Sequence, residues 1–273
     1  MSKVKQVRAW GLSDTGKKRR QNEDSFLLGH EHGLFVVADG MGGHLGGAVA
    51  SGLTVKTIAE VVKANKKTLN SKSLSGGLEQ HPAAQLLADA MRAACEKVFT
   101  QGLKNAELTG MGTTATCLLL VGSHAFVGHV GDSRAYLVRG GQMMQLTEDH
   151  SLVHQQVKDG LITEEQAKTS PFRNVITRSI GFERDVDVDV IGLKTEPGDV
   201  FVLCTDGLTL HVADHEILAA TQDPQLSLAP AKLVELANSR GGEDNITALV
   251  IQMGTDSPGA VTQPGKRKKT RLI

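Results

Sequence analysis

Six acidic residues stand at the ends of apolar, strand-like runs, where side chains from different strands can meet. The run FVVADGMGGH reaches an aspartate and then glycines, and VFVLCTDGL repeats this pattern. AFVGHVGDSR places an acid after a third run, whereas NEDSF and GGEDNITALV place acids just before one. The set is Glu23, Asp24, Asp39, Asp132, Asp206 and Asp244. Each Asp-Gly pair alone is ordinary turn chemistry, but the repetition at strand ends indicates a shared site.

Carboxylates gathered on one rim of a sheet need a cation, because several like charges cannot stay ionised side by side. Oxygen ligands without a convincing histidine or cysteine cluster favour Mg²⁺ or Mn²⁺. Two such ions bridged by a water lower the pKa of that water, supply a hydroxide nucleophile and neutralise a phosphoryl group. In this interpretation Asp39 bridges the ions, and the missing side chain of Gly40 leaves its carbonyl free to coordinate.

Two other kinds of phosphate chemistry fit the sequence poorly. GLSDTGKK matches a nucleotide-binding P-loop except at Lys18, which replaces the Ser or Thr that would hold Mg²⁺. A strand-like run follows within a few residues, so the helix that a P-loop requires has no room. A cysteine-dependent phosphatase needs an arginine six residues after its nucleophile, and Cys95, Cys117 and Cys204 are followed there by Gln, Ser and Leu.

Composition restricts the class of protein further. The 273 residues include 30 basic and 30 acidic side chains, so no global charge favours nucleic acid or a membrane surface. The three separated cysteines favour a reducing compartment and exclude a disulfide framework. The N-terminal stretch has no signal-peptide apolar segment, and no apolar run is long enough to cross a bilayer. We therefore expect a cytoplasmic protein that does not insert into membranes.

The hydrophobic pattern predicts an α+β fold. Strand-like runs lie at 7–12, 25–28, 34–38, 113–121, 125–130, 135–138, 186–191, 200–204 and 246–251. Helical spacing of apolar residues occurs at 48–62, 83–98, 217–220 and 228–237. Several central strands follow one another directly, which favours antiparallel sheets with helices packed outside over a doubly wound parallel sheet.

Two segments lack this periodicity. Residues 66–80, KKTLNSKSLSGGLEQ, are polar and rich in Ser and Gly, which predicts a mobile loop between two helices. Residues 254–273 combine Pro and Gly with a basic cluster, KRKK, and predict a disordered basic tail. We therefore expect one domain over residues 1–253.

Eight motifs together resemble the protein phosphatase 2C-like, metal-dependent Ser/Thr phosphatases of the bacterial type. They are RRQNEDSF, VVADGMGGH, GMGTTAT, VGDSRAYL, LTEDHS, ITRSIG, LCTDGL and EDNITALV, in the order of the family. The resemblance implies a β-sandwich of two antiparallel sheets with helices on both outer faces. It also implies hydrolysis of phosphoserine and phosphothreonine by a hydroxide that bridges two metal ions. The substrates would be phosphorylated proteins, those of an opposing Ser/Thr kinase, and the protein would be a monomer.

The resemblance also assigns metal ligands residue by residue. Asp39 would bridge two Mn²⁺ or Mg²⁺ ions, with the Gly40 carbonyl on one ion and Asp206 and Asp244 on the other. Asp132 would join Asp206 at a third, weaker metal site. Glu23 and Asp24 match the pair that positions metal-bound waters.

Three further positions complete the implied site. Arg19 matches the phosphate-binding arginine of the family, although Arg20 adjoins it and leaves an ambiguity of one residue. His44 follows Asp39 by five residues and would serve as general acid to the leaving group, or as a structural residue. His150 would serve the fold and the neighbouring variable flap at 151–171. The alternative to an enzyme is an inactive phosphatase fold that binds phosphoproteins, but none of the metal aspartates is lost.

Overall fold

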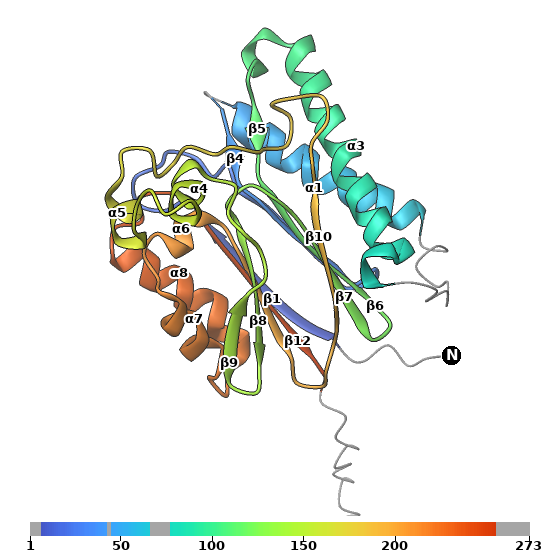
Figure 1. Cartoon of the computed structure of the whole chain (residues 1–273), viewed down its shortest axis with the longest axis vertical. Coiled ribbons are helices and arrows are strands. Elements are labelled where there is room, and N and C mark those ends of the chain that lie inside the picture. The colour runs from blue at the N-terminus through green and yellow to red at the C-terminus, as the bar shows by residue number, and fades with distance from the viewer. Residues whose placement is uncertain (1–6, 43–44, 66–76, 255–273) are drawn as a thin grey trace, which may run out of the picture.

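The computed structural model describes residues 7–42, 45–65 and 77–254, and places two antiparallel five-stranded sheets face to face. Helices cover the outer face of each sheet, as Figure 1 shows. This arrangement confirms the predicted α+β sandwich. The chain passes from one sheet to the other several times, so the residues at one end of the sandwich come from distant parts of the sequence.

The first sheet carries the strands that lead to Asp39 and Asp132. Its strand order is β10 (Asp189–Lys194), β7 (His124–Val130), β6 (Ala115–Val121), β3 (Leu34–Ala38) and β2 (Ser25–Gly29). All five residues of β3 are buried, because this central strand has the other sheet on one side and helices on the other.

The second sheet carries the strands next to Asp206 and Asp244. Its order is β1 (Val7–Asp14), β12 (Ile246–Met253), β11 (Val200–Cys204), β8 (Arg134–Arg139) and β9 (Gln142–Gln145). A short third pairing joins β4 (Gly40–Met41) to β5 (Gly112–Thr113). This pairing holds the two residues that directly follow Asp39.

Three apolar clusters hold the layers together. The cluster between the sheets takes side chains from both of them, including Phe35, Leu118, Phe201 and Leu249. A second cluster joins the first sheet to α1 (Gly46–Ala64) and α3 (Pro82–Lys104). A third joins the second sheet to α7 (Asp214–Thr221) and α8 (Ala229–Ser239). Burial of apolar surface on both faces of each sheet is the main stabilising contribution to the fold.

Several predicted boundaries differ from the observed ones. The expected strand at 113–121 is divided into β5 and β6, because residues 113 and 114 bond to Asp39 and leave the ladder at that point. The strand expected at 186–191 begins at Asp189 and runs to Lys194. The first predicted helix begins at Gly46 and the second extends to Lys104. Pairing with distant strands and docking on a sheet decide such boundaries, which local patterns leave open.

The pattern also missed short elements. These are β4, β9, α4 (Leu152–Lys158), α5 (Glu164–Thr169), α6 (Asp206–Thr209) and the 3₁₀ turns η1 (Leu78–Gln80), η2 (Ala106–Leu108) and η3 (Leu226–Leu228). Elements of this length show too little periodicity to be recognised. Residues 19–24, which follow the P-loop-like sequence at 11–18, contain no helix, so the rejection of that motif is confirmed for this described segment.

Some predictions fall outside the described residues. These are the role of His44, most of the loop predicted at 66–80, and the tail beyond residue 254. The boundary proposed at residue 253 coincides with the end of β12 and otherwise stays a prediction. Within the described ranges, no helix has the length and apolarity required to span a membrane.

Candidate active site

The antiparallel pairing brings the predicted acids to one end of the sandwich. Ala38, the last residue of β3, pairs with Ser25, the first residue of β2. Asp39 and Asp24 therefore lie next to each other at the same end of the two strands. In the other sheet, Cys204 at the end of β11 pairs with Ala248 near the start of β12. Asp206 and Asp244 therefore also meet, just beyond these strands.

Electrostatic coupling shows that the acids of both sheets share one site. Burial, followed by the charges of Asp24 and Asp206, raises the pKa of Asp39 well above its ordinary value. The carboxyl groups of Asp39 and Asp206 lie within hydrogen-bonding range, and Asp132 adds a further repulsive contribution. The negative charge of this cluster is therefore not compensated by protein groups alone.

Asp24 is held in a cradle of hydroxyl groups. Its Oδ2 accepts hydrogen bonds from Thr205 Oγ1 (2.9 Å) and Thr247 Oγ1 (2.6 Å), while its Oδ1 is buried with no partner in the described residues. Burial outweighs these bonds and raises the pKa of Asp24 to about 7. The two threonines come from β11 and β12 regions of the opposite sheet, so Asp24 ties the sheets together at the site.

The donor set fits a hard divalent cation. Oδ1 of Asp24 and Oδ1 of Asp206 are buried oxygens without a partner in the described part of the chain, and every candidate ligand is an oxygen. Among the same residues, no three acidic, histidine or cysteine side chains form a ready-made ligand group. The site is thus a set of neighbouring carboxylates in which Arg19 pairs with Asp244 and two threonines bond to one oxygen of Asp24.

Gly40 is required by close packing. A Cβ atom there would lie 2.1 Å from the Gly47 carbonyl oxygen and 2.6 Å from the Glu23 carbonyl oxygen. Gly47 in turn would bring a Cβ to 2.6 Å from Glu23 Oε2. The chain after Asp39 therefore packs directly against the start of α1 and against the Glu23 segment. This close packing is a reason for the two glycines that the sequence analysis did not give.

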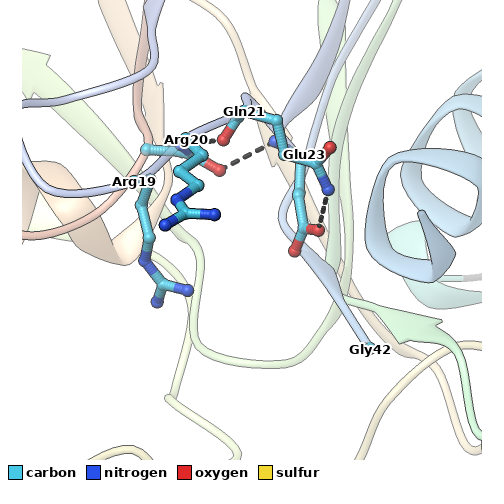
Figure 2. A pocket seen from close by; sticks show the side chains of 6 residues that line it. Arg19, Arg20, Gln21, Glu23 and Gly42 are labelled. Carbon is cyan, nitrogen blue, oxygen red and sulfur yellow. Dashed lines mark hydrogen bonds between the residues drawn. The ribbon is translucent and has the colours of Figure 1, made fainter. Parts of the chain in front are cut away.

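Two arginines line a pocket of about 360 Å³ beside the acids, together with Gln21, Glu23, Gly42 and Asn245 (Figure 2). Arg19 Nη2 donates to Asp244 Oδ2 at 2.6 Å. Burial alone would lower the pKa of Arg19, but the charges of Asp244, Asp39 and Glu23 outweigh burial and raise this pKa above its ordinary value. In the described residues the Arg20 side chain has no ion-pair partner. Arg19 is therefore the arginine in contact with the acidic cluster.

Several anchoring residues belong to the family motifs but had no role in the sequence interpretation. Thr114 Oγ1 accepts from the Asp39 N–H (2.9 Å), and Thr113 Oγ1 donates to the Asp39 carbonyl (2.7 Å). Asn245 Oδ1 accepts from the Glu23 N–H (2.7 Å). Asn245 Nδ2 also donates to the Gln21 carbonyl (3.0 Å). The sequence signal that could have identified these anchoring residues is their position as polar residues directly at the ends of apolar runs.

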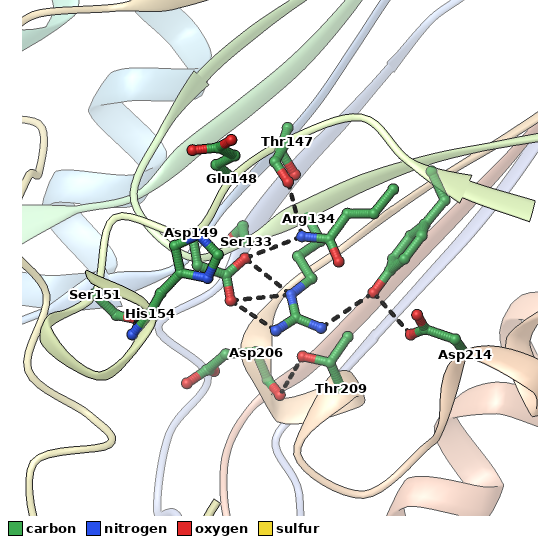
Figure 3. Close-up of polar contacts among 12 residues, drawn as sticks. Ser133, Arg134, Thr147, Glu148, Asp149, Ser151, His154, Asp206, Thr209 and Asp214 are labelled. Carbon is green, nitrogen blue, oxygen red and sulfur yellow. Dashed lines mark hydrogen bonds and ion pairs between the residues drawn. The ribbon is translucent and has the colours of Figure 1, made fainter. Parts of the chain in front are cut away.

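Asp132 lies on a buried turn between β7 and β8. Burial, then the charges of Asp206 and Asp149, raises the pKa of Asp132 to about 8, against an opposite effect of Arg134. Arg134 forms a two-pronged ion pair with Asp149, with Nη2 to Oδ2 at 2.6 Å and Nε to Oδ1 at 2.9 Å (Figure 3). This ion pair holds Arg134, the first residue of β8, in place directly after the turn that carries Asp132.

The three cysteines are free and buried. Burial raises the pKa of Cys204 to about 12 and also raises the pKa of Cys95 and Cys117. A thiol in this state is not a nucleophile near neutral pH. The rejection of a cysteine-dependent mechanism is consistent with these environments.

The raised pKa values predict an unusual pH dependence of stability without metal. An Asp24 with a pKa of about 7 in the folded protein and 3.8 as its ordinary value binds its proton more tightly when folded. The folded state therefore loses stability as the pH rises from about 4 to about 7, since the unfolded chain ionises first. Asp132, with a pKa raised to about 8, acts in the same direction.

Chemical denaturation in EDTA at pH 5, 6, 7 and 7.5 measures this effect. We expect the contribution of the cluster to the free energy of unfolding to fall over this range, and Mn²⁺ to stabilise the protein more at pH 7.5 than at pH 5. Asp24→Asn should flatten the profile, whereas the exposed Asp89→Asn on α3 should not. Stabilisation by Mn²⁺ that is independent of pH would contradict the expectation.

The fold and the site define a class of protein. Carboxylates from two antiparallel sheets meet at one end of an αββα sandwich, beside an arginine that can bind a phosphoryl group. This is the arrangement of a metal-dependent phosphoprotein phosphatase.

Comparison with known proteins agrees with this class. Residues 16–236 match the family model described as Protein phosphatase 2C. The chain is 36% identical to the serine/threonine protein phosphatase PstP of Mycobacterium tuberculosis over 92% of its own length and 46% of PstP, so it spans about half of that relative. It is 34% identical to the serine/threonine phosphatase stp of Listeria innocua, over 88% of this chain and 93% of stp.

A solved structure is similar as well. The crystal structure of the catalytic domain of PstP in complex with two manganese ions has a TM-score of 0.78 and 35% sequence identity, covering 91% of this chain and 98% of that one. The chain belongs to the protein phosphatase 2C family.

Proposed function

We propose that this chain hydrolyses phosphoserine and phosphothreonine in proteins with the help of two divalent cations. The observation that carries the proposal is the meeting of acids from both sheets around Asp39, with buried oxygens of Asp24 and Asp206 left without partners in the described residues. Relatives that the chain covers almost completely are serine/threonine phosphatases, and one structural relative holds two manganese ions.

The residues of the site take distinct roles in this proposal. Asp39 would bridge the two ions, the Gly40 carbonyl would bind one, and Asp206 and Asp244 would bind the other. When bound, Mn²⁺ or Mg²⁺ supplies an activated water as nucleophile and neutralises phosphoryl charge. Two further sets complete the site: Glu23 and Asp24 for metal-bound waters, and Asp132 with Asp206 for a third, weaker ion.

Arg19 would bind and orient the phosphoryl group. Its guanidinium is half exposed at the pocket, with its side chain at 52% accessibility, and is paired with one aspartate oxygen only. A planar guanidinium binds two phosphate oxygens at once, so Arg19 would exchange Asp244 for substrate. His44, which lies outside the described residues, stays the proposed general acid.

A p-nitrophenyl phosphate assay with Mn²⁺, repeated in excess EDTA, tests the proposal. We expect turnover with Mn²⁺ and its loss in EDTA, with recovery when Mn²⁺ is restored. A phosphothreonine peptide assayed in parallel connects the result to protein substrates. Equal activity with and without EDTA would contradict metal dependence. Absence of activity under all conditions would favour the inactive, phosphoprotein-binding alternative.

The proposal also includes the setting in which the enzyme acts. Its substrates would be the products of an opposing Ser/Thr kinase, and it would act as a cytoplasmic monomer. The substrates are supported by matched relatives that are serine/threonine phosphatases, and the reducing compartment by the three free cysteines. Phosphoproteomics of a deletion strain would identify the substrates, and light scattering would measure the oligomeric state.

A further inference from the structure

His150 is a buried histidine next to the turn that carries Asp132, and the proposed chemistry does not use it. It is 8% exposed. Its backbone N–H donates to the Gly131 carbonyl at 2.7 Å, and the Gly131 N–H donates to its Nδ1 at 3.0 Å. A single residue therefore satisfies both polar backbone groups of Gly131, the residue before Asp132.

The hydrogen bonds also determine the tautomer of His150. Because the Gly131 N–H is a donor, Nδ1 must accept and the ring hydrogen lies on Nε2. Nε2 is 2.9 Å from Asp189 Oδ2 and donates to it. Asp189 is itself held by Arg178, whose Nη1 donates to Oδ1 at 2.7 Å. Burial lowers the pKa of His150, in spite of Asp189, which keeps the ring neutral near neutral pH.

The opposite side of the same turn is fixed by the Asp39 segment. Gly131 has φ +110°, and a Cβ there would lie 2.5 Å from Thr114 Cγ2. Ser133 Oγ lies 2.7 Å from Thr114 Oγ1, which also accepts from the Asp39 N–H. The Asp132 turn is thus enclosed between Thr114, which connects it to Asp39, and His150, which connects it to Asp189 of β10.

We propose that His150 is a positioning residue for Asp132. Its Nδ1 accepts from the Gly131 N–H, and its backbone N–H holds the carbonyl of the Gly131–Asp132 peptide, so that the carboxylate faces Asp206. Asp189 keeps the imidazole in the required tautomer and orientation. The consequence for metal binding rests on the proposed function, in which Asp132 and Asp206 hold a third ion. Loss of a group that orients a ligand typically weakens metal binding about 10- to 100-fold.

Two amide variants separate the two ends of the ring. In His150→Asn the amide can replace Nδ1 and accept from Gly131, but it is too short to reach Asp189. In His150→Gln the amide can replace Nε2 and bond to Asp189, but it leaves the Gly131 N–H unpaired. Both variants lose the ring, and thermal melts would confirm that both are folded.

The first measurement needs no metal. NMR-detected hydrogen exchange in EDTA should show the Gly131 amide protected in wild type and His150→Asn, and exchanging at least about tenfold faster in His150→Gln. Equal protection of Gly131 in the two variants would overturn the proposal, whatever the metal content of the protein.

The second measurement is calorimetric titration with Mn²⁺, with Asp132→Ala as the reference that lacks the third site. We expect His150→Gln to weaken the weakest ion about tenfold and to lower kcat more than it changes KM, and His150→Asn to stay within about twofold of wild type. Equal third-ion affinity in the two variants would count against the proposal. A wild type that binds only two ions, unaffected by Asp132→Ala, would instead refute the ligand role of Asp132, and hydrogen exchange would still decide whether His150 holds the turn.

Discussion

Asp39→Asn is expected to lower kcat at least about a thousandfold while leaving the fold intact, which corresponds to about 4 kcal/mol of transition-state stabilisation. Asp39 is the acid whose pKa is affected by Asp24, Asp206 and Asp132 together, so it is central to the cluster. An amide of the same shape removes the negative charge that two cations would share. Calorimetry should show that Mn²⁺ binding is weakened along with turnover.

The stability of this variant provides the internal check. Because burial and like charges disfavour the ionised form of Asp39, a neutral amide should leave the melting temperature in EDTA unchanged or higher. The exposed Asp89→Asn is the matched control and should retain full activity. If Asp39→Asn retained more than about a tenth of wild-type kcat with both ions bound, Asp39 would not be the bridging ligand.

Arg19→Ala should lower kcat/KM for a phosphothreonine peptide about a hundredfold, mainly through KM, and should leave Mn²⁺ binding intact. Nη2 of its guanidinium lies 2.6 Å from Oδ2 of Asp244, an acid of the cluster. Its removal takes away two charge-assisted hydrogen bonds to the phosphoryl group but no metal ligand.

Arg20→Ala is the matched control for this experiment. The neighbouring arginine lines the same pocket but has no ion-pair partner within the described chain, so we expect a change in KM of less than about threefold. Steady-state kinetics and calorimetry on both variants resolve the ambiguity between the two arginines. An Arg19→Ala protein that lost Mn²⁺ as severely as Asp39→Asn would show that the assignment of Arg19 to phosphate is wrong.

Much of the fold was predictable because its strongest signals are local. The continuous apolar runs of β3 and β11 are strands buried on both faces, and the direct succession of central strands indicated antiparallel sheets. The prediction failed at short elements such as β9 and α4, and at the division of 113–121 into two strands. β9 and α4 are too short to show a clear periodicity, and the division of 113–121 depends on hydrogen bonds to the distant Asp39 segment.

The candidate site was also predictable in part from the sequence. The residue types and their positions at strand ends were sufficient to select the acids, oxygen-ligated cations and the family. The sequence also showed that no cysteine has the arginine spacing of a thiol-dependent phosphatase. These conclusions could be drawn from the sequence because strand ends and turns are local features, which a short stretch of residues is sufficient to indicate.

Only the tertiary structure decided how these residues meet. The register of β2 with β3, and of β11 with β12, places Asp24, Asp39 and Asp206 in one buried volume. The same packing makes Arg19 the partner of Asp244, and joins His150 to the Gly131–Asp132 turn. The physical reason is that side-chain direction, burial and the resulting pKa depend on which distant strands become neighbours, and that is determined when the two sheets pack together.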